Sequence, residues 1–80
     1  MDKVNCAIIG PGNIGMNLLY KIRKSKLLEC SLIIGRNENS VNLNLAKNKG
    51  YFVSAESTKA LIKYEQMYDI VFDATTAESH

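Results

Sequence analysis

Short apolar runs alternate with amphipathic stretches along the whole chain. The first run, residues 4–9 (VNCAII), is rich in β-branched residues and is typical of a buried parallel strand. From residue 14 onward, apolar side chains recur every fourth position and polar side chains fill the opposite side, which predicts a helix with one buried face. The apolar positions of this helix are Ile14, Leu18, Leu19 and Ile22.

The middle of the chain repeats this alternation. Residues 31–34 are largely apolar and are closed by Gly35, which predicts a second buried strand. A second helix is predicted to begin near Ser40, a favourable N-cap residue, and to stop at Gly50, a residue type that often follows a helix end. Residues 51–53 then predict a third, short strand.

The last part of the chain adds one more helix and one more strand. Ser57 is predicted to cap a third helix, in which Ala60, Leu61 and Tyr64 share one face. Residues 69–73 predict a fourth strand, buried between its two aspartates. Because helices separate the strands, hairpins are excluded, and the sheet is predicted to be parallel with right-handed crossovers.

The strongest chemical signal follows the first strand directly. The segment matches G-x-G-x-x-G, and its place between a predicted strand and a predicted helix gives this otherwise weak pattern its meaning. Its residues are Gly10, Pro11, Gly12, Asn13, Ile14 and Gly15. In such a turn the first glycine permits the bend, the second lets backbone approach a pyrophosphate, and the third allows close packing of helix on strand. The N–H groups and the dipole of the helix start then bind the anion.

This turn and the element order together predict an α/β fold, the Rossmann-type doubly wound parallel sheet that binds dinucleotides. A six-strand sheet of that type needs more chain than 80 residues. We therefore expect residues 1–80 to be the N-terminal part of a dinucleotide-binding domain, with the catalytic domain elsewhere in a longer protein. A P-loop nucleoside triphosphatase is excluded because no G-K-[ST] follows the glycines. A regulatory dinucleotide-sensing domain remains open.

Two further segments fall where such a sheet contacts its cofactor. At the end of the second strand a carboxylate usually binds the adenosine ribose hydroxyls, whereas an arginine accommodates a 2′-phosphate. This chain has Arg36 and Asn37 there. We favour NAD, with Asn37 bonded to the ribose, and leave NADP open. Beyond the fourth strand, Ala74 and Thr75 are expected to line the cofactor cleft, and Asp73 to tie the loop by hydrogen bonds.

Charge and hydropathy exclude several classes of protein. A net charge of +2 is too small to indicate nucleic-acid binding, and the basic residues at 21–26 fall at a predicted helix end, where cations complement the dipole. The sequence has no signal peptide and no apolar stretch of the roughly 20 residues that a membrane helix needs. We therefore expect neither a nucleic-acid nor a membrane partner.

The titratable side chains provide no catalytic centre. Cys6 and Cys30 lack the spacing of a metal site or a disulfide framework and are expected to be core residues of a reduced, cytoplasmic protein. Cys6 falls inside the first strand, and Cys30 is expected just before the second, at the end remote from the cofactor. Neither position offers the accessible, positive surroundings of a reactive thiolate. His80 has no partner in the sequence and is given no role, and no metal site is predicted.

Three segments, taken in order, closely resemble the N-terminal part of the acylating acetaldehyde dehydrogenases. They are 7–15 (AIIGPGNIG), 26–29 (KLLE) and 69–75 (DIVFDAT), and Thr76, Ala77 and His80 continue in step. The family typically shows A-I-I-G-S-G-N-I-G, a Leu-Glu before the second strand, and D-I-V-F-D-A-T-S-A with a histidine shortly after. The similarity spans essentially all 80 residues, which correspond to about the first quarter of such an enzyme.

The resemblance implies oxidation of acetaldehyde, or another short aldehyde, to its acyl-coenzyme A with reduction of NAD. A cysteine outside these residues adds to the aldehyde, and coenzyme A takes up the acyl group after hydride transfer. Residues 10–15 carry the family's dinucleotide-binding turn. In aromatic-degradation pathways such enzymes pair with a 4-hydroxy-2-oxovalerate aldolase, and we expect the full-length protein to be a homo-oligomer. The 80-residue chain alone is expected to be inactive.

Two places depart from the family pattern. Pro11 stands where serine is common, which removes a backbone N–H and a hydroxyl near the phosphates. Arg36 and Asn37 stand where many members have Ile-Asp, which puts a strict preference for NAD in question. Since many dehydrogenases share the single motifs, another oxidoreductase of this fold, such as a semialdehyde dehydrogenase, remains an alternative.

Overall fold

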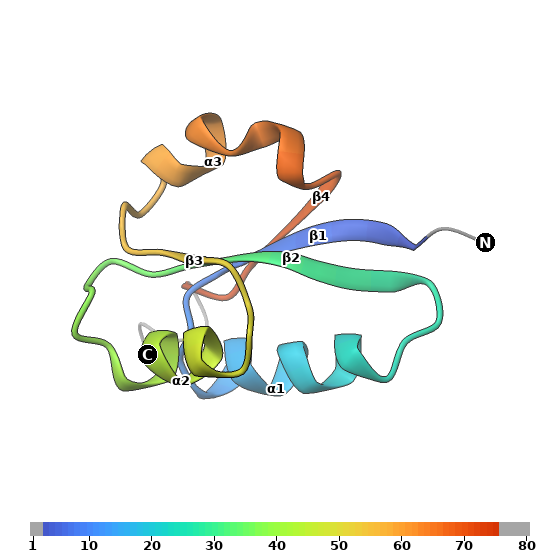
Figure 1. The fold of residues 1–80 in the computed structure, drawn as a ribbon, viewed down its shortest axis with the longest axis horizontal. Coiled ribbons are helices and arrows are strands. Elements are labelled where there is room, and N and C mark those ends of the chain that lie inside the picture. The colour runs from blue at the N-terminus through green and yellow to red at the C-terminus, as the bar shows by residue number, and fades with distance from the viewer. Residues whose placement is uncertain (1–2, 76–80) are drawn as a thin grey trace.

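The chain folds into a four-stranded parallel sheet with helices on both faces (Figure 1). The computed structural model describes residues 3–75. The strands are β1 (Val4–Ile9), β2 (Leu28–Ile34), β3 (Val53–Ser54) and β4 (Ile70–Asp73), in the spatial order β3-β2-β1-β4. The helices are α1 (Asn13–Arg23), α2 (Val41–Asn48) and α3 (Lys59–Lys63), followed by the 3-10 helix η1 (Glu65–Met67). The predicted α/β, Rossmann-type parallel sheet is confirmed.

The direction in which strands are added reverses between β1 and β4. The chain runs outward from β1 through β2 to β3 with α1 and α2 on one face, then crosses by α3 on the other face to β4, on the far side of β1 (Figure 1). Doubly wound sheets bind ligands outside the carboxyl ends of their strands at such a reversal. The fold therefore directs attention to the segments that follow β1 and β4.

Each face of the central strands packs against its own apolar core. Successive residues of a strand point to opposite faces, so that Cys6 and Ile8 join the core under α1 and α2, while Ala7 and Ile9 join the core under α3. The α1–α2 core also takes Met16, Leu19, Ile22, Leu43 and Ala46. Burial on both faces explains why the carboxyl-terminal halves of the two strands, residues 6–9 and 32–34, are apolar without alternation.

Helix α1 buries a face slightly different from the predicted one. Its buried residues are Gly15, Met16, Leu19 and Ile22. Ile14, predicted to be part of the apolar stripe, is 48% exposed. A hydrophobicity pattern gives glycine no weight, and yet Gly15 is buried, with the carbonyl oxygen of Gly10 in the space that a side chain would need.

Strand β2 begins at Leu28, earlier than the predicted start at residue 31. The register between β1 and β2 shifts after Cys6, which pairs with Cys30, so that Ala7 pairs with Leu32. Ser31 is the extra residue of this bulge, and its hydroxyl donates to the carbonyl of Met67 at 2.5 Å. The polar bulge residue interrupts the apolar pattern, and the expected position of Cys30 outside the strand was therefore wrong.

The other predicted boundaries change less. Strand β3 comprises Val53–Ser54, because the N–H of Tyr51 still bonds to the carbonyl of Ala46 at the end of α2. Ser57 does not cap α3 with its side chain; it has a φ of +56°, and its carbonyl accepts the N–H of Ala60. Residues 3–75 contain no helix with both the length and the apolar character of a membrane crossing.

Strand β4 is not buried as predicted. Ile70 is 42% exposed and Val71 37% exposed. In the described part of the chain β4 pairs only with β1, so its other edge has no neighbouring strand. Among the described residues β4 is therefore an edge strand. Its side chains are more apolar than those of a partly exposed edge strand need to be.

Candidate functional site

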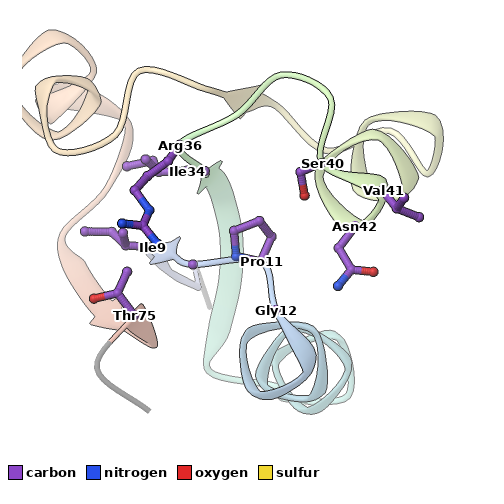
Figure 2. A pocket seen from close by; sticks show the side chains of 11 residues that line it. Ile9, Pro11, Gly12, Ile34, Arg36, Ser40, Val41, Asn42 and Thr75 are labelled. Carbon is purple, nitrogen blue, oxygen red and sulfur yellow. The ribbon is translucent and has the colours of Figure 1, made fainter. Parts of the chain in front are cut away.

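A cleft of about 320 Å³ opens at the carboxyl end of the sheet, where the strand order reverses. Its walls come from the turn after β1, the end of β2 with the residues that follow it, the start of α2, and Thr75 beyond β4. Figure 2 shows Pro11 near the middle of this space, with Arg36 and Thr75 to one side and Ser40 and Asn42 to the other. The cleft thus lies where doubly wound sheets bind their ligands.

The chain leaves β1 through Gly10. Its φ of +93° lies in the left-handed region that favours glycine, so the sharp bend predicted here is present. The N–H of Gly10 donates to the carbonyl of Ile34 at 2.9 Å, which ties the turn to β2. A Cβ on Gly10 would lie 3.1 Å from the backbone nitrogen of Thr75. The missing side chain therefore lets the segments after β1 and β4 come together.

Gly15 lies directly beneath this bend. A Cβ on Gly15 would be 2.0 Å from the carbonyl oxygen of Gly10, and 3.6 Å from the side chain of Ile8. The first of these atoms belongs to the backbone and cannot rotate away. The predicted close packing of α1 on the strand is therefore present, and only glycine fits this position.

Helix α1 presents its N-terminal end to the cleft. Gly12 is the N-cap residue, lines the cleft, and accepts the N–H of Met16 through its carbonyl at 2.9 Å. No acidic side chain lies in the first turn of α1. The positive end of the helix dipole is therefore directed at the cleft without a local carboxylate to neutralise it.

Side chains shape the opposite wall, the loop between β2 and α2. Ser40 caps α2, its Oγ accepting the N–H of Leu43 at 3.3 Å, as the sequence predicted. The Oδ1 of Asn37 accepts the N–H of Asn39 at 2.9 Å. The side chain of Asn44 reaches back from α2 and donates to the carbonyl of Ser40 at 2.9 Å. These local bonds fix the path of the loop past the cleft.

Among the described residues that line the cleft, Arg36 carries the charge. It follows Gly35 at the end of β2 and is exposed. In Figure 2 its side chain extends toward the side of the cleft on which Thr75 lies, and away from Ser40 and Asn42. The guanidinium therefore adds to the positive character of the cleft.

Asp73 closes the floor beside Thr75. The carboxylate Oδ1 of Asp73 accepts both the N–H of Thr75, at 2.9 Å, and the Thr75 hydroxyl. These bonds from Thr75 stabilise the charged form and lower the pKa of Asp73 below its ordinary value. The N–H of the buried Ala74 donates to the carbonyl of Ile9 at 2.8 Å. Asp73 therefore ties the loop, as expected from the sequence.

The structure brings together part of the predicted site. Gly10, Pro11, Gly12, Arg36 and Thr75 line the cleft. Gly15 lies beneath the turn and Ala74 is buried behind it, so neither lines the cleft itself.

Three other predicted residues lie apart from the lining. Asn13 lines a separate groove between α1 and α2, Ile14 is on the exposed side of α1, and Asn37 lies in the loop outside the cleft. The family-like ending at Thr76, Ala77 and His80 falls outside the described residues.

Sequence reasoning missed several residues of the cleft wall: Ile9, Ile34, Gly35, Ser40, Val41 and Asn42. The carboxyl ends of the first two strands give a signal for Ile9 and Ile34, because these ends border the ligand site in every sheet of this type. Ser40 was identified as a helix cap. Ser40 also lines the cleft because the N-terminus of α2 lies beside the turn, and the sequence alone does not give that position.

The two cysteines pair with each other inside β1 and β2 and do not line the cleft. Cys6 is fully buried and Cys30 is 7% exposed, and both are free thiols. Burial raises the pKa of Cys30 to about 12, and burial also raises the pKa of Cys6. Both residues therefore lack the accessible, anion-stabilising surroundings of a nucleophilic thiolate.

Comparison with models of protein families gives no match. Several curated proteins nevertheless match the whole chain. The acetaldehyde dehydrogenases of Bacillus thuringiensis and Desulfitobacterium hafniense are 46% and 48% identical to it, and that of Geobacillus stearothermophilus is 42% identical. These matches cover 99% to 100% of the chain and 27% of each relative, so the chain spans about a quarter of the length of these curated relatives. The chain is thus a homologue of the acetaldehyde dehydrogenases, matching their N-terminal region.

Proposed function

We propose that this chain is the nicotinamide-dinucleotide-binding part of an acylating acetaldehyde dehydrogenase, which converts acetaldehyde, coenzyme A and NAD⁺ to acetyl-coenzyme A and NADH. The observation that carries the proposal is the glycine turn at the cleft, in a chain that matches acetaldehyde dehydrogenases along its whole length. In this proposal residues 1–80 are the N-terminal part of the dinucleotide-binding domain, and the catalytic domain lies outside them.

The described residues suit a dinucleotide in three respects. At the turn of residues 10–15 the wall is mostly backbone, because side chains at Gly10 and Gly15 are excluded by their neighbours. The N-terminal end of α1 offers N–H groups and a positive dipole to a pyrophosphate. The remaining wall combines apolar Ile9 and Ile34 with polar groups, as ligand pockets usually do. We assign the pyrophosphate to residues 10–15 and the adenosine to the wall after β2, which carries Arg36.

The chemistry divides between this chain and the rest of the protein. A nicotinamide dinucleotide bound here accepts a hydride from the substrate. The residues of this chain bind the dinucleotide, orient it against the sheet, and hold the floor of the cleft through the bonds between Asp73 and Thr75. Since Cys6 and Cys30 are buried and do not line the cleft, we place the nucleophilic cysteine in the catalytic domain. The 80-residue chain alone should bind the dinucleotide and turn nothing over.

The partners in this proposal come from the family resemblance. They are acetaldehyde and coenzyme A as substrates, further copies of the full-length chain in a homo-oligomer, and a 4-hydroxy-2-oxovalerate aldolase as the supplier of the aldehyde. Two free, buried thiols suit a reducing compartment, and we place the protein in the cytoplasm. The resemblance favours NAD, whereas Arg36 leaves NADP open.

The decisive experiment is nicotinamide reduction by the complete gene product with acetaldehyde, with and without coenzyme A. Reduction that depends on coenzyme A is the expected result. Reduction without any need for coenzyme A would point to a different aldehyde oxidation. Dinucleotide binding without reduction would favour another oxidoreductase or a sensing domain. No binding of either dinucleotide would overturn the proposal altogether.

A further inference from the structure

The charge of the cleft has one sign. Arg36 lines it, and no carboxylate lines it among the described residues. Acidic side chains on neighbouring segments lie outside the lining: Glu56 pairs with Lys63 at 2.9 Å, Asp73 accepts from Thr75, and Glu38 belongs to the loop after β2. An additional anion would therefore be attracted to this cleft rather than repelled.

Arg36 stands at the position that selects between the two nicotinamide cofactors. In doubly wound sheets the adenosine ribose lies at the end of the second strand, where a carboxylate bonds the 2′-hydroxyl or an arginine accommodates a 2′-phosphate. Arg36 is the second residue after β2 and is exposed, so its long side chain is able to change direction. Its fork of N–H donors matches a phosphate well.

Asn37 lies outside the cleft lining, so it does not place an acceptor for a ribose hydroxyl in the cleft. Its Oδ1 is turned to the loop, where it accepts the N–H of Asn39. Ser40 does line the cleft. The bond from Leu43 uses a lone pair of the Ser40 hydroxyl and leaves its O–H proton able to donate to an anion. The loop therefore offers donors to the ligand where a carboxylate would offer acceptors.

We propose that this cleft recognises an adenosine that carries a 2′-phosphate, with Arg36 as the specificity-determining residue, so that the chain binds NADP more tightly than NAD. The inference rests on the proposed dinucleotide function and changes one part of it, the preferred cofactor, from NAD to NADP. A charge-assisted pair between Arg36 and the phosphate should be worth at least about tenfold in affinity. The same guanidinium would also attract the 3′-phosphate on the adenosine of coenzyme A, which is a second source of the same chemistry.

Calorimetric titration of the full chain tests the inference with four probes. NAD and NADP differ by the 2′-phosphate alone. Adenosine 2′,5′-bisphosphate and adenosine 3′,5′-bisphosphate then distinguish the dinucleotide from coenzyme A. We expect NADP to bind at least about tenfold more tightly than NAD, and the 2′,5′-bisphosphate more tightly than the 3′,5′ isomer.

Two variants and a matched control locate the effect. Arg36→Gln should remove the preference for NADP by weakening NADP at least about tenfold, and it should weaken NAD much less, because NAD brings no 2′-phosphate to this side chain. Circular dichroism checks that the variant folds. Asn37→Asp keeps the acceptor for Asn39 and places a negative charge in the loop, so it should weaken NADP selectively. Arg23→Gln removes the same charge from the last turn of α1, far from the cleft, and should change neither affinity.

Each of the other results contradicts either the NADP preference or the proposed function. NAD binding as tightly as NADP or more tightly, or an unchanged preference in Arg36→Gln, would overturn the inference and leave the proposed function standing. Tighter binding of the 3′,5′-bisphosphate would reassign the cation to coenzyme A. Binding of no probe would remove the proposed function and the inference with it.

Discussion

At the turn after β1 the cleft is built from backbone, whereas at the loop after β2 it is built from side chains. Gly10 bonds to the carbonyl of Ile34, and the missing side chain of Gly15 leaves room for the carbonyl of Gly10. In the loop, by contrast, Ser40 caps a helix through its hydroxyl, Asn37 bonds to the chain two residues on, and Arg36 is exposed.

This difference separates two properties of a binding site. In the proposed function, the backbone of the turn decides whether a dinucleotide binds, because Gly10 and Gly15 leave no room for a side chain. Side chains in the loop are replaceable without moving the sheet, so in the same proposal they decide which dinucleotide is preferred. Substitutions in the turn after β1 and in the loop after β2 should therefore have different effects. The following variants test that expectation, from the largest effect to the smallest.

Gly15→Ala should have the largest effect, and on stability. The new Cβ would overlap the carbonyl oxygen of Gly10 at 2.0 Å, so α1 must move, which we expect to cost about 3 kcal/mol or more. Urea unfolding measures the loss. Gly50→Ala is the control: it has a φ of +98° but nothing within 4 Å, so strain alone should cost about 1 kcal/mol. Equal losses in the two variants would contradict the backbone contact.

Gly12→Val should abolish dinucleotide binding and leave the fold intact. The φ of Gly12 is −81°, which valine adopts without strain, but a branched side chain would occupy the approach of the pyrophosphate. Calorimetry should show an affinity at least about a hundredfold lower, equal to about 2.7 kcal/mol. Circular dichroism checks that the helices remain. An unchanged affinity would remove the turn from the binding site.

Ser40→Ala should lower the stability moderately, because the Ser40 hydroxyl caps α2 at the end of the loop after β2. Loss of the bond to the N–H of Leu43 is expected to cost about 1 kcal/mol in unfolding free energy. Ser40→Thr keeps an acceptor and should restore most of it. If alanine and threonine were equally stable, the cap would contribute nothing to the loop.

Asp73→Asn should have the smallest effect, visible mainly as a change in pH dependence. The pKa of Asp73 lies below its ordinary value of 3.8 because Thr75 donates to the carboxylate. The folded state therefore gains stability from this group above the ordinary pKa, and loses that gain as the pH falls through the lowered one. Since the carboxylate is exposed, the gain is small. Unfolding between pH 6 and pH 2 should be slightly less acid-sensitive in the variant, and a steeper acid dependence would contradict the assignment.

Much of the fold was predictable because its signals are local. The element order followed from apolar runs, and Gly10 to Gly15 located the turn, since both features depend on nearby residues. The start of β2 was missed because Ser31 satisfies its hydroxyl on Met67, a contact that no pattern around residue 31 contains. The exposure of Ile70 depends on what lies beyond β4, and periodicity carries no information about that.

The site was predictable to the same extent. Residues that contribute backbone could be assigned from glycine spacing, as for Gly10 and Gly12. Residues that contribute side chains could not: Asn37 was expected to face the ribose, but its side-chain oxygen bonds within the loop. Asn42 entered the cleft wall only through the position of α2. A side chain with a local hydrogen-bond partner has a choice of direction that sequence alone does not decide.

The place of β1 in the sheet has a consequence for the order in which the protein is made. Among the four described strands β1 is synthesised first, and its two neighbours are far apart in the chain, since α2, β3 and α3 lie between β2 and β4. A nascent chain that has released β1, α1 and β2 already contains the glycine turn, yet it lacks Thr75 and the bond from Ala74 to Ile9 that close the cleft floor. A dinucleotide should therefore bind only after β4 has emerged and paired with β1. The binding site forms when these four strands are complete.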